Sequence, residues 1–190
     1  MGLVNLSLIV IAALSLGFLT KLVDLEVDND IDLRGMGCLL ALFYGLIMVY
    51  TIRNVVILSS LILAVIIAVI ATGKIDSFSH GIGVGTALAG TLILGIPPVN
   101  WPLFMFFLIT ALLDEIASDL ADSGKLTGFL GKFFKMRPFL ELTTLLFSLY
   151  TYYFEFWVFI FIYDVSYQLT RLFVLHGRKL RDWDVENRSG

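Results

Sequence analysis

Residues 101–125, WPLFMFFLITALLDEIASDLADSGK, join an almost pure hydrocarbon run to a dense group of carboxylates. Asp114, Glu115, Asp119 and Asp122 fall within nine residues of each other at the end of this run. On a helix that crosses a membrane, acids at the C-terminal end repel one another, oppose the helix dipole and lose hydration. Because these acids are present despite the cost, we predict a membrane helix whose polar end is functional or compensated by other groups.

The composition of the whole chain agrees with a membrane protein. Of its 190 residues, 58% are hydrophobic and 15% are charged, whereas soluble domains have about 45–50% and about 25%. Apolar runs of roughly 15 to 21 residues recur along the chain, about the length that crosses a bilayer core. The single cysteine, Cys38, allows no disulfide within one chain. We therefore predict an all-α polytopic membrane protein with no sizeable soluble domain and no nucleic-acid partner.

The apolar runs divide into seven predicted spans. They form one transmembrane domain, residues 1–175, followed by a charged cytoplasmic tail, residues 176–190. Prolines in GIPPVNW end one helix firmly, but YTYYFEFW, residues 150–157, has neither Gly nor Pro. Residues 138–175 could therefore form one helix instead of two. The spans are expected at about 3–20, 36–51, 54–72, 79–97, 100–119, 138–153 and 155–175.

Basic residues decide between these two arrangements. With seven spans and an outside N-terminus, twelve of the thirteen Lys and Arg residues lie on the inner side, and only Arg53 lies outside. Cytoplasmic loops carry an excess of Lys and Arg. One long final helix would put the basic segment 125–137 and the basic tail on opposite sides. The pattern therefore favours seven spans, an outside N-terminus, a cytoplasmic C-terminus and a multi-pass protein of the cell membrane.

The carboxylates of the opening stretch are candidate metal ligands. On a helix, Glu115, Asp119 and Asp122 share one face, and Asp114 lies about 100° away from Glu115. Hard divalent cations bind clustered carboxylate oxygens. We predict Asp114, Glu115 and Asp119 as ligands of Mg²⁺ or Mn²⁺. The alternative is that nearby lysines neutralise a hydrated helix end.

A second acidic segment, KLVDLEVDNDIDLRG, residues 21–35, follows the first span. It does not have the spacing of an EF-hand, because it lacks Gly at the sixth position and Glu at the twelfth. A solvated acidic loop is one interpretation. Asp24 lies nearest the membrane, so we predict it as a further metal ligand.

The segment TGKIDSFSHGIGVGTALAG, residues 72–90, opens the fourth span. Asp76 and His80 are four residues apart, a spacing that lets two ligands or an acid–base pair share one helix face. Asp76 could instead cap the helix, as Ser77 and Ser79 also could. Lys74 is a candidate phosphate contact near the helix N-terminus. Gly81 and Gly85 have the spacing of a close helix-packing pair, with a phosphate-cradling loop as the alternative.

Asp164 is the deepest charged residue, within FIFIYDVSYQLTR, residues 159–171. Acids at such depth are costly and usually face the interior of the bundle, where many are functional. We predict Asp164, with Asp76 and His80, as catalytic. Arg171 shares its helix face and is a second candidate phosphate contact. The alternative is a structural ion pair of Asp164 with Arg171 or Lys74.

Together these residues predict a divalent-metal-dependent membrane enzyme. Its substrate would be a prenyl or lipid (pyro)phosphate at the cytoplasmic face, and its reaction transfer or hydrolysis. A metal neutralises phosphate oxygens while Lys or Arg completes the clamp. A transporter or cation-binding channel using Asp164 and Glu141 stays open, as does a structural subunit of a homo-oligomer or membrane complex. The outer halves of the spans offer few polar groups, which favours the enzyme.

The segment DEIASDLADSGKLTGFLG, residues 114–131, resembles the second aspartate motif of UbiA-type intramembrane prenyltransferases. That motif pairs spaced aspartates with a downstream Gly-Lys on the cytoplasmic side. Asp114, Asp119 and Asp122 are the matching positions, and Asp24 and Asp28 are the candidates for the first motif. No Asn-Asp opens that first cluster, and the chain is shorter, with fewer spans, than the family. The resemblance therefore implies a shared chemical solution rather than membership.

Overall fold

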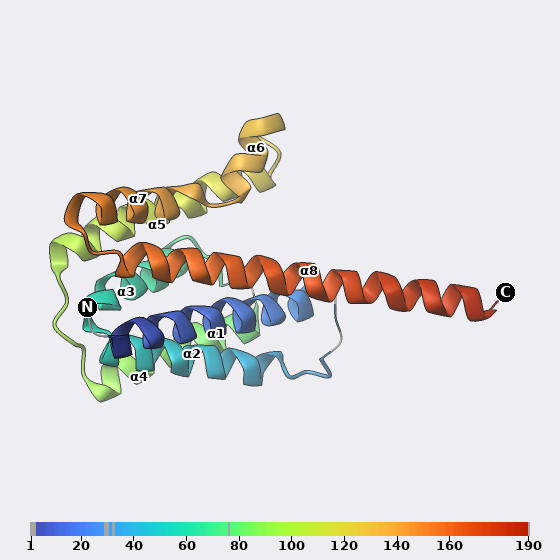
Figure 1. Cartoon of the computed structure of the whole chain (residues 1–190), viewed down its shortest axis with the longest axis horizontal. Helices are drawn as coiled ribbons and strands as arrows, with labels where there is room; N and C mark the ends of the chain where they lie inside the picture. The colour runs from blue at the N-terminus through green and yellow to red at the C-terminus, as the bar shows by residue number, and fades with distance from the viewer. Residues whose placement is uncertain (1–2, 29–30, 32, 76, 190) are drawn as a thin grey trace.

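The computed structural model describes residues 3–28, 31, 33–75 and 77–189, with side chains from residue 6 to residue 177 of these ranges. Within them the chain forms eight helices and no strand, so the predicted all-α class is confirmed (Figure 1). The helices are α1 (Leu3–Val27), α2 (Gly37–Asn54), α3 (Val56–Ala71), α4 (Phe78–Leu94), α5 (Trp101–Asp122), α6 (Gly128–Lys135), α7 (Pro138–Thr151) and α8 (Glu155–Ser189).

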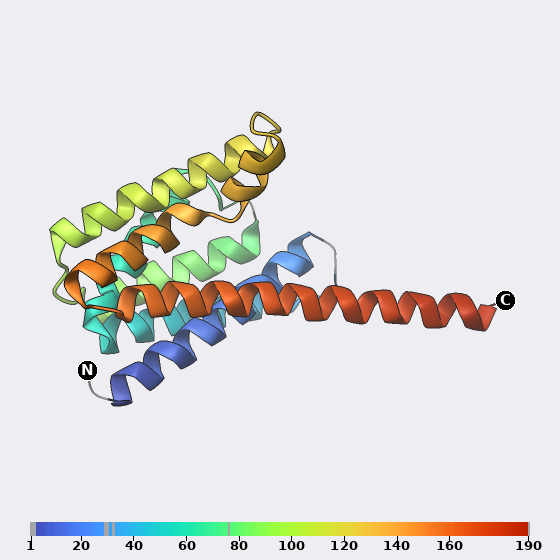
Figure 2. The ribbon, with the colours of Figure 1, turned by 45° about the horizontal axis from the view of Figure 1, so that its top comes forward.

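The seven longer helices alternate in direction. The connections α1–α2, α3–α4 and α5–α6–α7 lie at one end of the bundle, where α8 also runs on past the other helices (Figures 1 and 2). We call this the basic end, because the predicted Lys- and Arg-rich segments lie there. The connections α2–α3, α4–α5 and α7–α8 lie at the opposite end, which carries Trp101 and the tyrosines of residues 150–153 and is called the aromatic end.

Residues 138–175 form two helices, as the pattern of basic residues favours, and Tyr152 makes the turn between them in a left-handed conformation (φ 62°). The Ser148 hydroxyl donates to the Tyr153 carbonyl over 2.8 Å and closes the turn without Gly or Pro. The helices differ from the predicted spans in two other places. Residues 120–137, expected to be a connection, include the short helix α6. The expected tail is helical as far as Ser189, because α8 continues through it.

Three of the described helices are long and apolar enough to span a membrane. The three spans are Leu6–Val27, Gly37–Asn54 and Glu155–Gly177, and α3 and α4 are shorter apolar helices. Large apolar side chains also cover the outside of the bundle, for example Ile93 and Leu146. In water this surface would expose a large apolar area, which is unfavourable, so it suits a lipid environment. These lengths and this surface indicate association with a membrane.

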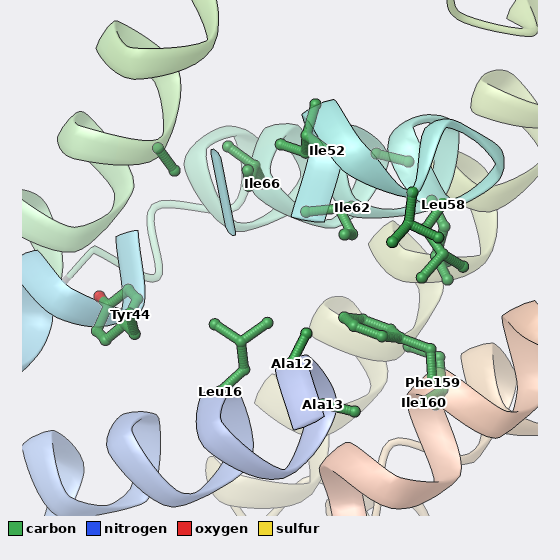
Figure 3. Packing of buried hydrophobic residues seen from close by; sticks show 14 of the residues in the cluster. Ala12, Ala13, Leu16, Tyr44, Ile52, Leu58, Ile62, Ile66, Phe159 and Ile160 are labelled. Carbon is green, nitrogen blue, oxygen red and sulfur yellow. The ribbon is translucent and has the colours of Figure 1, made fainter. Parts of the chain in front are cut away.

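The hydrophobic core lies between α1, α2, α3 and α8 and is continued by α4 and α5 (Figure 3). Side chains from four helices interdigitate, which fixes the rotation of each helix about its axis. The labelled members in Figure 3 are Ala12, Ala13, Leu16, Tyr44, Ile52, Leu58, Ile62, Ile66, Phe159 and Ile160. Tyr44 is the only one with a polar atom, and it marks where the core gives way to polar groups.

Glycines bring α2 and α4 into close contact, but not the predicted pair. A Cβ at Gly83 would overlap the Tyr44 ring, and a Cβ at Gly45 would lie 2.5 Å from the Gly83 carbonyl. A Cβ at Gly85 would meet no described atom within 4 Å, and one at Gly81 would lie in ordinary contact with a side chain, at 3.6 Å. The prediction that Gly81 and Gly85 form the packing pair is therefore wrong, because α4 turns a different face towards α2.

Candidate functional site

A cavity of about 520 Å³ lies at the basic end of the bundle, with lining residues from each of the helices α1 to α8. The alternating helix directions bring the C-terminal ends of α1, α3 and α5 and the N-terminal ends of α4 and α7 to this one place. Its charged or titratable lining residues include Asp24, Asp28, Tyr44, Lys74, His80, Asp114, Glu115, Asp122, Lys135, Arg137, Tyr163, Asp164 and Tyr167. Most of the residues predicted from the sequence therefore surround a single cavity.

Asp24 and His80 form a direct pair across α1 and α4. The His80 Nε2 atom lies 2.9 Å from the Asp24 Oδ1 atom. The Tyr167 hydroxyl of α8 donates to the other carboxylate oxygen, Oδ2. The Lys21 Nζ atom is 3.7 Å from the same oxygen and donates to the Tyr167 hydroxyl over 3.2 Å. Asp24 is therefore a hydrogen-bonded anion held by groups from three helices.

The second ring nitrogen of His80 also has a partner. The Tyr44 hydroxyl of α2 lies 3.3 Å from His80 Nδ1 and 3.3 Å from the His80 carbonyl oxygen. His80 occupies the first turn of α4. Its amide donates to the hydroxyl of Ser77 over 3.2 Å, so Ser77 caps the helix. With a carboxylate on one ring nitrogen and a phenol near the other, the imidazole is oriented to take up and pass on a proton.

A second group of charges joins α5 to the segments that follow α3 and α6. Lys74 pairs with Asp119 and lies 3.9 Å from the Glu115 Oε2 atom, and it donates to Ser118 over 3.4 Å. The Arg137 guanidinium lies 3.0 Å from Glu115 Oε1. Glu115 is only 5% exposed. A buried carboxylate needs such partners, because an unpaired buried charge is strongly destabilising.

Asp114 caps α7 from the neighbouring helix. Its two oxygens accept the backbone amides of Phe139 and Leu140 over 2.8 and 2.6 Å. These amides belong to the first turn of α7, where four N–H groups have no partner within their own helix. Asp114 is 4% exposed, so the cap lies inside the protein. Asp114 therefore has a structural role that the sequence did not suggest.

The predicted metal ligands do not form one centre. Asp24 belongs to the His80 pair, Asp114 binds amides, and Glu115 and Asp119 bind Lys74. In the part of the chain that the structure describes, no three His, Cys, Asp or Glu residues gather as a set of metal ligands. The described carboxylates thus have separate partners, and a site for Mg²⁺ or Mn²⁺, whose ligands would converge on one point, stays a prediction.

The remaining predicted residues have separate positions. Asp164 lines the cavity and forms no hydrogen bond or ion pair with any described residue, while the charges that influence it include Glu141, Asp114 and Arg137. Arg171 is exposed on α8 and is not among the lining residues. Asp76 lies outside the described residues. The structure thus brings Asp164 to the cavity but does not bring Arg171 there.

Arg137, Tyr44 and Tyr167 are the site residues that the sequence prediction missed. Arg137 precedes Pro138 and has a left-handed backbone (φ 51°), which is uncommon for a residue other than glycine and is often found at functional sites. Partial burial disfavours its charge, but the surrounding carboxylates, Glu115 first, raise the pKa of Arg137 above its ordinary value. It is therefore a permanent cation at the cavity wall.

Charge in the cavity is unbalanced. Among the lining residues that the structure describes, six carboxylates face three Lys or Arg side chains and His80. Several acids are neutralised by the pairs above, but Asp164 is not. Acidic groups therefore outnumber basic ones in the lining, while Arg137 and Lys74 offer local contacts for an anion.

Fold and site together define an all-helical protein with candidate membrane-spanning helices and one charged cavity at the end of the bundle. No protein-family model, no curated protein and no solved structure matches the chain.

Proposed function

We propose that the protein is an integral membrane enzyme that acts on a prenyl or lipid (pyro)phosphate at the cytoplasmic face, by transfer or hydrolysis. One observation carries the proposal: a single cavity at the basic end holds both the Asp24–His80 pair and the cations Lys74 and Arg137. Acid–base groups and anion-binding groups in one place are what cleavage of a phosphate bond requires.

The proposed topology has seven spans, an outside N-terminus and a cytoplasmic basic end. The count of Lys and Arg residues supports it, as do the aromatic side chains at the other end, where Tyr150 is 86% exposed. Helix α7 has 14 residues, about 21 Å at 1.5 Å per residue, against about 30 Å for the hydrocarbon core. Its span would therefore need a locally thinner bilayer or help from interfacial side chains.

A substrate phosphate would bind between Arg137 and Lys74. The guanidinium can contact two phosphate oxygens at once, and the Lys74 ammonium adds a compact charge. His80 would act as the general acid or base. Asp24 orients its ring and stabilises the charged imidazole. The hydrocarbon part of the substrate would stay among the apolar helices.

A closed floor supports an enzyme rather than a pore. On α5 and α8 the lining residues nearest the aromatic end are Ala111 and Ile160. One turn further towards the aromatic end, the rings of Phe107 and Phe156 lie 5.0 Å apart and are 0% exposed. A site sealed on one side excludes water and keeps its substrate on the other side.

The excess of carboxylates supports a role for Mg²⁺ or Mn²⁺. An anionic substrate would meet repulsion from Asp164 and its neighbours unless cations came with it. A divalent ion bound with the phosphate would supply charge neutralisation. The metal requirement stays a prediction, because the carboxylates do not converge on one point.

The test is release of phosphate or pyrophosphate, with water as the acceptor, by the purified full chain in lipid nanodiscs. Phosphatidic acid and farnesyl pyrophosphate would be supplied with Mg²⁺, Mn²⁺ or EDTA. We expect His80→Gln to lower kcat by about 10²–10⁴, the usual contribution of a general acid or base. Arg137→Gln should lower kcat/KM by about tenfold to a hundredfold.

Substituting Arg171 and Arg137 in turn distinguishes the phosphate contact predicted from the sequence, Arg171, from the one that lines the cavity, Arg137. Arg171→Gln should leave turnover unchanged if the phosphate binds in the cavity, whereas Arg137→Gln should not. Equal losses from both variants would show that the phosphate binds elsewhere. Absence of turnover with either lipid under all three metal conditions would reject the enzyme.

A transporter or cation channel is the second candidate, and Asp164 favours it. An acid inside a bundle without an ion-pair partner is typical of proton and cation pathways. The phenylalanine floor opposes this function in the described conformation. Proteoliposomes with a trapped pH dye or cation dye would distinguish the two: uptake that Asp164→Asn abolishes, without lipid turnover, supports the transporter.

A further inference from the structure

A second hollow lies beside the cavity, between the end of α6 and the beginning of α7. It has a volume of about 220 Å³ and is lined by Phe133, Met136, Pro138, Glu141, Leu142 and Leu145. Five of these six side chains are apolar. We call it the α6–α7 groove. Its width and lining suit a hydrocarbon chain rather than a polar ligand.

The groove and the cavity share a wall. Met136 lines both of them, and the next residue, Arg137, lines the cavity. The first turns of α7 separate the two spaces, because Leu140 faces the cavity while Leu142 and Leu145 face the groove. A molecule with a polar head and an apolar tail can therefore occupy both spaces only by bending around Met136.

Helix α6, beside the groove, has the side chains of an interfacial helix. Phe129 and Leu130 are exposed on it, and Lys132 and Lys135 are exposed beside them. A short helix with exposed aromatic and basic side chains is typical of the membrane interface. Lys132, Lys135 and Arg137 also follow one another along the rim, which suits a negatively charged headgroup.

We infer that the α6–α7 groove binds one hydrocarbon chain of a phosphate-bearing membrane lipid, whose headgroup reaches Arg137 past Met136. The inference rests on the proposed function and names the lateral route by which the substrate enters. Arg137 would exchange part of its contact with Glu115 for the phosphate. The left-handed backbone of Arg137 turns the polypeptide sharply where it passes between the cavity and the groove.

Photocrosslinking of the full chain in nanodiscs tests the inference. The probe is phosphatidic acid with a diazirine in the middle of one acyl chain, and mass spectrometry locates the labelled peptides. We expect labels within residues 133–145. Leu142→Trp would fill the groove and should lower labelling there by about tenfold, equivalent to about 1.4 kcal/mol of binding free energy. Leu149→Trp, on α7 at the aromatic end, is the matched control.

A competition arm needs no substitution and so does not depend on a variant that folds. Excess unlabelled phosphatidic acid should suppress labelling of the groove more strongly than excess diacylglycerol, and Arg137→Gln should remove that difference. Equal suppression in the unsubstituted chain, or labels spread evenly over α7, would overturn the inference.

Turnover measured on the same samples keeps the two proposals apart. Labelling of the groove without any lipid turnover would leave the lipid site standing and reject the enzyme. Turnover that Leu142→Trp and Leu149→Trp affect equally would leave the enzyme standing and reject the groove as the entry route.

Discussion

At the aromatic end of the bundle, α5, α7 and α8 meet through rings, whereas at the basic end α5 meets α7 through charges. The Phe107, Phe147 and Phe156 rings have centroids 5.0 to 5.9 Å apart. At the basic end Asp114 of α5 accepts two amides of α7, and Glu115 binds Arg137 just before α7. The same pair of helices is thus joined by two different kinds of interaction.

The difference separates stability from function. Apolar contacts are non-directional and within a membrane stabilise through close packing, so ring packing stabilises without selecting a ligand. Hydrogen-bonded charges have fixed partners and lose much when one is removed. We therefore expect the aromatic end to contribute most of the free energy of unfolding and the basic end to hold the groups that bind and react.

The largest expected effect is on stability, at the aromatic end. Phe107→Ala removes a fully buried ring that touches Phe147 and Phe156, and should lower the free energy of unfolding by about 3–5 kcal/mol. Denaturation with increasing SDS in mixed micelles measures it. Phe173→Ala, on the exposed face of α8, should change stability by less than about 0.5 kcal/mol. Similar losses in the two variants would contradict the assignment of the ring cluster as the core.

An intermediate effect is expected at the basic end, where Asp114 is a cap. Asp114→Ala leaves the amides of Phe139 and Leu140 without acceptors and should cost about 1–3 kcal/mol. Asp122→Ala removes only an exposed pair with Lys135, at 3.1 Å, worth less than about 1 kcal/mol. Hydrogen exchange resolved to residues 138–142 gives a second measurement, because only Asp114→Ala should speed exchange there.

The cap also bears on the metal prediction. A cap acts without metal, so the cost of Asp114→Ala should be the same in EDTA and in millimolar Mg²⁺. A cost that appears only with Mg²⁺ would instead identify Asp114 as a metal ligand and contradict the capping role.

Much of the fold follows from local patterns in the sequence. Apolar runs, the prolines before α5 and the cap Ser77 locate most helix ends within a few residues. The order of basic segments predicts which helix ends lie together. Helix α6 was not predicted. Its sequence, GFLGKFFK, has glycines at the first and fourth positions and only eight residues, which gives a weak helical pattern.

The sequence predicts at which end of the bundle the site residues lie, but not which of them are in contact. Alternating spans bring Asp24, His80, Asp114 and Asp164 to one end whatever the rotation of each helix. Their partners depend on that rotation, which is set by packing against distant helices. Tyr44 illustrates this limit, because it lies in the middle of an apolar run with no polar neighbour and meets His80 only after α2 packs on α4.

The same limit explains the metal prediction. Glu115 and Asp119 share a helix face, as their spacing requires, and a shared face allows either a cation or a pair of basic side chains. Lys74 and Arg137 come from segments that sequence spacing cannot relate to α5. Local periodicity therefore shows where a charge must be compensated, but not which group compensates it.

The smallest expected effect is a gain in stability, back at the aromatic end. Tyr152 is 81% exposed and occupies the left-handed position after α7, where glycine is preferred. Tyr152→Gly should relieve this strain and raise the free energy of unfolding by about 0.5–1 kcal/mol. Tyr150→Gly removes a similar exposed ring from within α7 and should lower it by up to about 1 kcal/mol. Because both variants lose one interfacial tyrosine, the difference in sign isolates the backbone, and a loss in both would mean that the rings, not the turn, matter at this end.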